Sequence, residues 1–592
     1  MNVPEVPDLY HSQIKILGML STYIEKTERS DTTNLQSSIV NIQFRLVRVG
    51  WQEEQMMAKL DLLITNASII DGTGNPCYFA HIGIVDGKIA GISRDIGNLN
   101  PARTIDAEGM TVCPGFIDTH SHDDAYLLIK PQGDDKVRQG VTTDVIGNCG
   151  FSLAPISDKH RDDLRNALAI MGGGYLPEEF WNLSSFNEFL TILEGAKLGI
   201  NVVPLVGHGT IRIAVVGFEN RAPTESELAE MKQLTADAMQ AGAFGLSSGL
   251  IYVPANYAGT DEIIELAKVA GHQFKGIYTT HMRSEGDQQM AAIDETLKIA
   301  YEAGIAAHIS HHKIIGRNNW GQSKDTLKLL ATARANGLAV TCDQYPYQAG
   351  STILAAALPP HIQAQGPQVF AEKLKAPAVR QAIINEIESG SDAQWENFIK
   401  GAGFKNIIIS VSPRHEEYIG KSIAQIAEMK TKNPYDVFFD LLIEERLEVI
   451  MVIFMMDDAD IIRILKDPIT MIGTDGIPGF GAGKVHPRMI GTFPRVLGRY
   501  VREQSVIRLE EAVRKMTSLP AQTFGLYRKG ILRDGLDADI VIFDPKTIID
   551  RSTFDNPAQP PAGINWVIVN GEVAVEHGQV TGATSGQVLR WG

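Results

Sequence analysis

The sequence predicts an α/β protein with a (β/α)8 barrel at its centre and a small β-domain formed from both ends of the chain. Apolar strand-like runs alternate with helical stretches through the middle of the 592 residues. Repeated β-then-α units imply a parallel sheet, and eight of them suggest a closed barrel. Short alternating strands with turn signals flank this region on both sides, and the termini of a domain often lie close together.

Length and charge limit the classes of function. A chain of 592 residues is too long for one simple core, so we expect two or more structural units. The net charge of −16, from 70 acidic and 54 basic residues, argues against nucleic acid or an anionic membrane as a partner. The longest apolar run, Val449–Met456, is too short to span a bilayer, and the N-terminus has no pattern of a secretory signal.

The cysteines favour a reducing compartment. The chain has four of them, none in a C-x-x-C pair: Cys77, Cys113, Cys149 and Cys342. Four cysteines in a chain of this length are no disulfide framework. We therefore expect a cytoplasmic protein.

Residues 1–57 differ in sequence pattern from the rest of the chain and are interpreted as an N-terminal extension of unknown role. They contain a possible amphipathic helix around Leu9–Glu28 and the strand-like run NIQFRLVRV. The stretch from Met57, MAKLDLLITNASIIDGTG, reads like a natural beginning.

The β-domain is predicted from two separate segments, 58–113 and 526–592. Alternating strands surround the D-G pair at 86–87 in the first and the N-G pair at 570–571 in the second. Both dipeptides are strong signals for tight β-hairpins.

The barrel is predicted over 114–525. Its eight strand candidates, the first of which begins at 111, are TVCPGFIDTHSH, TTDVIGNCG, NVVPLVGHG, FGLSSGL, GIYTTHMR, AAHISHHK, AVTCDQYPY and MIGTDG. Helices such as TESELAEMKQLTADAMQAG separate several of them. The segment from about 351 to 450 is interpreted as an insertion with helices of its own, and Val449–Met456 as a ninth strand at its end.

Side chains with metal-ligand chemistry recur where the predicted strands end. In GFIDTHSHDD, His120 and His122 share one face of a strand, where two imidazoles gain nothing from packing. A bare His-x-His also occurs in polar loops, but residues of this kind end four other strands as well, and barrel active sites lie at the carboxyl ends of the strands. The six residues that we expect at one metal site are His120, His122, Cys149, His281, His311 and Asp475.

Two other histidines at strand ends receive different interpretations. His208 in VGHG has no paired ligand nearby, so we expect a hydrogen-bonding histidine. His312 is adjacent to His311 and points the other way along a strand, so we expect a structural role.

Six motifs together resemble the N-acyl-D-amino-acid deacylases (D-aminoacylases) of the amidohydrolase superfamily. They are GFIDTHSHDD, QGVTTDVIGNCGFSLAP, THMRSEGD, ISHHK, DQYPYQAGST and GTDG. The similarity runs from about residue 59 to the C-terminus. It implies a barrel of the amidohydrolase type with Cys149 at the position where most relatives bridge two metals with a carboxylated lysine.

The resemblance implies a zinc enzyme that hydrolyses N-acyl-D-amino acids, its small-molecule partners. Cys149, His281 and His311 would hold one zinc tightly. His120, His122 and Asp475 would form a second, weaker site with the thiolate of Cys149 between the two. Zinc brings the pKa of bound water to about 7, and Asp475 would act as general base and then general acid.

The same resemblance implies the residues that handle the substrate. They are Tyr252, Lys313, Tyr345, Ser351 and Arg488. Lys313 lies two residues after His311, on the same strand face, which supports an inward direction. Arg488 is a plausible bidentate partner for the substrate carboxylate. Several fixed contacts distinguish enantiomers, so we expect D-amino acids, with apolar side chains such as those of methionine or leucine.

Two alternatives use the same fold. A cyclic-amide hydrolase of the dihydroorotase or hydantoinase type is expected to carry a bridging lysine at a strand end, and the sequence offers no convincing candidate. A non-catalytic scaffold would lose metal ligands, whereas all six positions are filled here.

Overall fold

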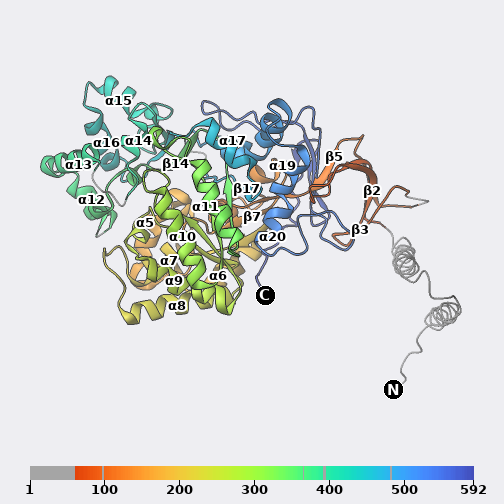
Figure 1. Ribbon diagram of the computed structural model, residues 1–592, viewed down its shortest axis with the longest axis horizontal. Helices are drawn as coiled ribbons and strands as arrows, with labels where there is room; N and C mark the ends of the chain where they lie inside the picture. The colour runs from red at the N-terminus through yellow and green to blue at the C-terminus, as the bar shows by residue number, and fades with distance from the viewer. Residues whose placement is uncertain (1–59, 96–98, 365, 391–394, 481–482) are drawn as a thin grey trace, which may run out of the picture. The chain divides into compact units, whose positions relative to one another are not determined.

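The structure, a computed structural model, describes residues 60–592 apart from 96–98, 365, 391–394 and 481–482 (Figure 1). The chain divides into Met1–Lys59 and Leu60–Gly592, and the fold described here is that of the second unit. The helix and the strand expected within residues 1–57 lie outside the described residues.

All eight predicted barrel strands are present, with one interrupted strand. Their bounds are β6 (Phe116–Asp118), β7 (Val141–Ile146), β8 (Asn201–Pro204) continued by β9 (Val206–Gly207), β10 (Gly245–Gly249), β11 (Ile277–His281), β12 (Ala306–Ile309), β13 (Val340–Gln344) and β17 (Thr470–Ile472). Neighbouring strands pair in parallel in the orders β6-β7-β8 and β9-β10-β11-β12-β13-β17.

The barrel closes between its first and last strands. A parallel bridge joins Ser121 to Gly476, just beyond the ends of β6 and β17. The amide of Asp475 donates to the carbonyl of His120 at 2.7 Å across the same seam. The predicted closed (β/α)8 barrel is therefore confirmed.

Helices follow the strands and cover the barrel. The main ones are α7 (His208–Val215), α8 (Glu225–Gln240), α9 (Thr260–Lys268), α10 (Gln289–Ala303), α11 (Ser323–Ala335), α17 (Asp458–Lys466) and α19 (Leu509–Met516). At the start of α8, Thr224 and Glu227 form a capping box that satisfies backbone amides at the helix N-terminus. Met231 and Met239, eight residues apart on α8, are buried.

Strands from both ends of the chain share one nine-stranded sheet, as predicted. Eight strands run in the order β21-β20-β19-β18-β5-β1-β2-β3, and β4 pairs with β1. Their bounds are β1 (Leu62–Ile69), β2 (Tyr78–Val85), β3 (Lys88–Ser93), β4 (Arg103–Asp106), β5 (Thr111–Pro114), β18 (Ile540–Phe543), β19 (Ile564–Val569), β20 (Glu572–Glu576) and β21 (Gln579–Val580). Both predicted hairpin turns have positive φ at their two central residues, as a type I′ turn requires.

The insertion contains an antiparallel sheet as well as helices. The sheet is β14-β16-β15, with bounds β14 (Ala349–Ile353), β15 (Ile407–Val411) and β16 (Ile450–Phe454). The helices are α12 (Pro367–Lys373), α13 (Pro377–Ser389), α14 (Phe398–Ala402), α15 (Ile423–Lys430) and α16 (Pro434–Glu444), which cluster at one end of the molecule in Figure 1. The predicted ninth strand is β16.

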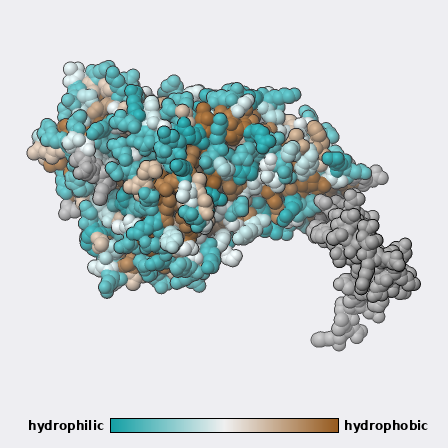
Figure 2. Space-filling view, viewed as in Figure 1, coloured by the Kyte–Doolittle hydropathy of each residue, from teal (hydrophilic) through white to brown (hydrophobic). Residues whose placement is uncertain are grey.

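The face drawn in Figure 2 is largely hydrophilic, with apolar residues in smaller groups between polar ones. Within the described part of the chain, no helix is both long and apolar enough to cross a membrane.

Candidate metal centre

The expected ligands meet at the carboxyl ends of the barrel strands. His281 is the last residue of β11, and the other five follow their strands by two to four residues. Cys149, His311 and Asp475 have φ angles of 54°, 40° and 49°, in the left-handed region that costs energy for residues with a side chain. After Cys149 the chain needs glycine, because a Cβ at Gly150 would lie 2.8 Å from the amide nitrogen of Gly249.

A buried lysine fixes the seam beneath the ligands. Nζ of Lys136 lies 2.5 Å from Oδ2 of Asp118 and 2.9 Å from Oγ1 of Thr474, and Oγ1 of Thr474 also donates to Asp118 at 2.6 Å. These contacts tie the end of β6 to the end of β17. They therefore set the relative positions of His120 and Asp475, each of which is at most two residues away.

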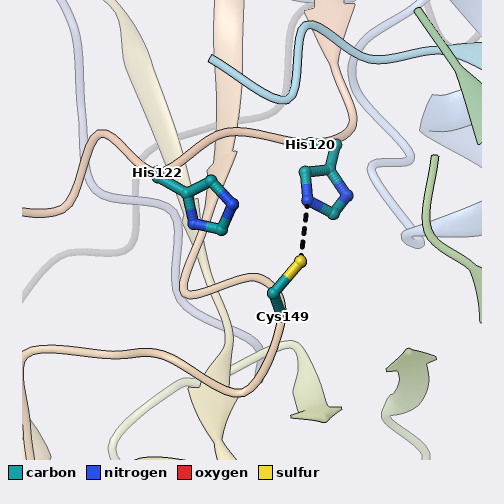
Figure 3. Close-up of side chains that lie close together, drawn as sticks. All are labelled: His120, His122 and Cys149. Atoms are coloured by element: carbon teal, nitrogen blue, oxygen red, sulfur yellow. Dashed lines mark hydrogen bonds between the residues drawn. The ribbon is translucent and has the colours of Figure 1, made fainter. Parts of the chain in front are cut away.

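Cys149 lies at the centre of the cluster. Its Sγ is 3.2 Å from Nε2 of His120, 3.6 Å from Nδ1 of His281 and 3.4 Å from Nε2 of His311. Figure 3 shows the thiol directed at His120, with His122 beside it. The sulfur thus faces imidazole nitrogens from three different strands.

Asp475 brings a carboxylate to the same place. Its Oδ1 lies 3.3 Å from Nε2 of His122 and 3.6 Å from Nε2 of His120. Potential ligand atoms lie within 4.8 Å of one another in three overlapping groups: His120, His122 and Cys149; Cys149, His281 and His311; His120, His311 and Asp475. The six residues can therefore serve one ion or two adjacent ions that share Cys149.

Zinc fits this set of donors. In a tetrahedral site with Zn–S of about 2.3 Å and Zn–N of about 2.0–2.1 Å, sulfur and nitrogen ligands lie roughly 3.5 Å apart. The distances from Sγ of Cys149 to His281 and His311, 3.6 and 3.4 Å, agree with that spacing. As metal ligands, the six residues remain a prediction.

The surroundings of the cluster favour neutral imidazoles and a protonated thiol, and they favour the thiolate only when a metal cation is bound. Burial lowers the pKa of His281 and His311 and lowers that of His122 to about 4, so all three carry free lone pairs at pH 7. Burial also raises the pKa of the Cys149 thiol well above its usual range. A bound divalent cation stabilises the thiolate and so lowers the pKa of Cys149, which means that metal binding releases the thiol proton.

Two carboxylates behind the histidines were not predicted. Oε1 of Glu285 lies 2.9 Å from Nδ1 of His311, and Oδ2 of Asp343 lies 3.7 Å from Nδ1 of His120. The available signals were slight: Glu285 follows His281 by four residues, and Asp343 is the fourth residue of the five-residue strand β13.

Four of the five predicted substrate-binding residues line one small cavity beside the cluster. The lining comprises Tyr252, Lys313, Tyr345 and Ser351, together with His281, Glu285, Asp475, Ile251, Gly350, Thr352, Phe398, Ile453 and Met455. Its volume of about 20 Å³ is enough for a single water. The insertion supplies one wall through Phe398 and Ile453.

Arg488, the fifth, is fully buried next to Asp475 and Tyr345. Its Nη1 lies 2.7 Å from Oδ2 of Asp475, and its guanidinium carbon lies 4.3 Å from the centre of the Tyr345 ring. Burial alone would raise the pKa of Asp475, but the charge of Arg488 and a hydrogen bond from His122 hold that pKa well below its usual range. Asp475 is therefore ionised at neutral pH.

Two arguments from strand direction need correction. Lys313 was expected to point inward because it shares a strand face with His311, yet β12 ends at Ile309 and both residues lie beyond it. His208 does not end a strand but begins α7, where its Nε2 lies 2.8 Å from Oε1 of Glu262. The hydrogen-bonding interpretation of His208 is confirmed, as is that of His312 as a buried histidine bonded to Thr326.

Comparison with known proteins places this geometry among characterised enzymes. Residues 103–575 match the model of the amidohydrolase family. The chain is 38% identical to D-aminoacylase of Alcaligenes xylosoxydans xylosoxydans over 530 residues, which cover 89% of this chain and 97% of the relative. It is 37% identical to N-acyl-D-aspartate deacylase of the same organism over 533 residues, or 90% of this chain and 95% of the relative.

A solved structure of a deacylase is also similar to this chain in fold and in sequence. The N-acyl-D-glutamate deacylase of Bordetella bronchiseptica, complexed with zinc and a phosphonate inhibitor that mimics the tetrahedral intermediate, has a TM-score of 0.76. It is 35% identical, and the alignment covers 90% of this chain and all of that one.

Proposed function

Because the chain belongs to the N-acyl-D-amino-acid deacylases of the amidohydrolase family, we propose that it hydrolyses the amide bond of N-acyl-D-amino acids to a carboxylate and a free D-amino acid. The observation that carries the proposal is the convergence of the Cys149 thiol on imidazole nitrogens from three strands. Cys149, His281 and His311 would hold zinc tightly, and His120, His122 and Asp475 a second ion. Bound zinc supplies a Lewis acid that activates water and polarises the amide carbonyl.

Asp475 is the proton carrier in this proposal. It is ionised before substrate arrives, because the charge of Arg488 and a hydrogen bond from His122 stabilise the carboxylate. An ionised carboxylate can take the proton of the attacking water and then deliver it to the leaving nitrogen. Its Oδ1 lies beside the histidines and Asp475 lines the cavity, so both transfers take place at one position.

The cations and hydroxyls in and beside the cavity orient the substrate. Arg488 and Lys313 can attract the α-carboxylate, while Tyr345 and Ser351 offer neutral hydrogen bonds. Tyr252 contacts the edge of His281, with ring centres 5.0 Å apart, and can direct its hydroxyl at the carbonyl oxygen. Fixing the carboxylate and the carbonyl together leaves one hand of the substrate with its side chain misplaced.

The cavity favours apolar side chains over acidic ones. Ile251, Phe398, Ile453 and Met455 form its apolar lining. Apart from the histidine, Lys313 is the one cation among its described lining residues, and Glu285 neutralises it at 2.5 Å. Once Arg488 and Lys313 attract the α-carboxylate, an aspartate or glutamate side chain would find no further lysine or arginine among the described lining residues. We also propose a cytoplasmic location, because the four free cysteines suit a reducing compartment.

A substrate panel tests the function. Purified protein is supplied with N-acetyl-D- and N-acetyl-L-forms of methionine, leucine, aspartate and glutamate, and free amine is measured. We expect the D-forms of methionine and leucine to be cleaved at least roughly 10²-fold faster than their L-forms, the scale of a misplacement of about 1 Å. Equal rates on both enantiomers would contradict the proposal, and faster cleavage of the acidic D-substrates would contradict the apolar preference.

A further inference from the structure

Glu285 contacts three groups of the site at once, although it was not among the predicted residues. Its Oε1 lies 2.5 Å from Nζ of Lys313 and 2.9 Å from Nδ1 of His311, and its Oε2 lies 3.7 Å from Nε2 of His281. The residue is 4% exposed. One buried carboxylate thus joins two proposed zinc ligands to a cation proposed to bind substrate.

The position of Glu285 bears on the tautomer of His311. Nε2 of His311 faces Cys149, so ligation through Nε2 requires a lone pair there and a proton on Nδ1. That Nδ1 proton has Glu285 as its acceptor. Ionised Glu285 can accept from both His311 and Lys313, because a carboxylate has about four lone-pair sites.

Lys313 competes for the same imidazole nitrogen. Its Nζ lies 2.8 Å from Nδ1 of His311 and can only donate. A bond from Lys313 to Nδ1 would require the opposite tautomer, with the proton on Nε2, and this tautomer cannot bind a metal through Nε2. The negative charge of Glu285 therefore decides between the two arrangements.

The loop that carries Glu285 is anchored by the insertion. Oε2 of Glu396 accepts a hydrogen bond from the Glu285 amide at 2.8 Å and from Oγ of Ser284 at 3.0 Å. Glu285 is thus held by its backbone from one side while its side chain reaches the histidines on the other.

We propose that Glu285 is a positioning residue that keeps His311 in the tautomer able to bind zinc, because its carboxylate accepts both the Nδ1 proton of His311 and the ammonium protons that Lys313 could otherwise donate to Nδ1. The proposal rests on the proposed function, because it takes Cys149, His281 and His311 as the zinc ligands. Carboxylates that orient ligating histidines typically contribute 10–100-fold to metal affinity.

Zinc affinity, measured by competition with a chromophoric chelator in the absence of substrate, tests the proposal. Glu285→Gln should weaken zinc binding by about 10–100-fold, and Glu285→Asp, which keeps the charge, should recover part of that loss. The matched control is Asp287→Asn in the same loop, whose contact is Nδ2 of Asn319 at 2.7 Å. It should bind zinc like the wild type. Unchanged affinity in Glu285→Gln, or an equal loss in Asp287→Asn, would overturn the proposal.

A double-mutant cycle isolates the competition by Lys313. In a Lys313→Met background the ammonium group can no longer donate to Nδ1, so Glu285→Gln should weaken zinc binding less than it does alone. An equal or larger loss in that background would refute the tautomer argument. If Glu285→Gln does not fold, Glu285→Asp with and without Lys313→Met provides the same comparison. Because no substrate is present, a protein that cleaves no N-acyl-D-amino acid but loses zinc in Glu285→Gln would refute the proposed function alone.

Discussion

The metal centre and the cluster around His208 both contain buried histidines, but the groups that these histidines face are different. In the His208 cluster, Nε2 of His208 lies 2.8 Å from one oxygen of Glu262, and Arg212 lies 2.6 Å from the other. Each carboxylate oxygen there faces a donor. At the metal centre, one thiol faces three imidazole nitrogens and no charge within the group offsets another.

The difference shows how a buried histidine can be interpreted. Both oxygens of Glu262 have a donor partner, so the carboxylate of the His208 cluster needs no added cation. Several lone pairs directed at one point need a cation to be stable, so the metal centre is complete only with an ion. The four predictions that follow test this contrast, from the largest expected effect to the smallest.

Replacing Cys149 should have the largest effect. We expect the wild-type protein to be purified with about one equivalent of zinc, and Cys149→Ala to lose both this zinc and at least roughly 10³-fold in activity, more than the 10–100-fold typical of outer partners. Metal analysis and turnover are measured on the same preparations. Cys113→Ala, which removes a fully buried thiol from β5, is the control and should keep its zinc. Normal turnover by Cys149→Ala without bound metal would contradict the proposal that activity depends on zinc bound by Cys149.

Replacing Asp475 should separate proton transfer from metal binding. Asp475→Asn keeps the shape but not the charge, so kcat should fall by about 10²-fold, within the range for a general acid–base group. The zinc held by Cys149, His281 and His311 should remain. The measurement is kcat at saturating substrate with the zinc content of the same sample. A variant within a few-fold of the wild type would remove Asp475 from the mechanism.

Replacing Arg488 should discriminate between substrates. Arg488→Ala should lower kcat/KM for an N-acetyl-D-amino acid about 10-fold or more beyond any loss for its carboxamide, because only the acid presents a carboxylate to the guanidinium. Arg495 is a close structural match, since it lies 4.3 Å over the Tyr347 ring and 2.8 Å from Asp550. Arg495→Ala should affect both substrates alike. Equal losses for acid and amide in Arg488→Ala would refute the carboxylate contact.

Replacing His208 should leave the metal in place. His208→Ala removes a buried hydrogen-bond partner of Glu262, which costs about 1–3 kcal/mol of the free energy of unfolding. Zinc content should equal that of the wild type, and unfolding in denaturant gives the stability. Loss of zinc from this variant would remove the distinction between the two clusters.

Sequence reasoning located the barrel, the shared sheet and the position of each barrel strand, because periodicity and turn residues are local properties. It did not find β14 or β15, because runs of about five residues cannot be assigned to strand or helix by periodicity alone. Glu285 and Asp343 were missed for a different reason. Their roles depend on which imidazole nitrogen each carboxylate reaches, and that is decided by the three-dimensional packing of separate loops.

The left-handed backbone at Cys149, His311 and Asp475 has a consequence for laboratory evolution of this protein. A side chain in that region costs of order 1–2 kcal/mol, which glycine avoids. Glycine at any of the three positions would relieve that strain, but at Asp475 it would also leave the buried Arg488 without its carboxylate partner, which costs more than the strain itself. Selection for heat-resistant variants should score turnover in the same round, because three residues with left-handed backbone belong to the proposed metal centre.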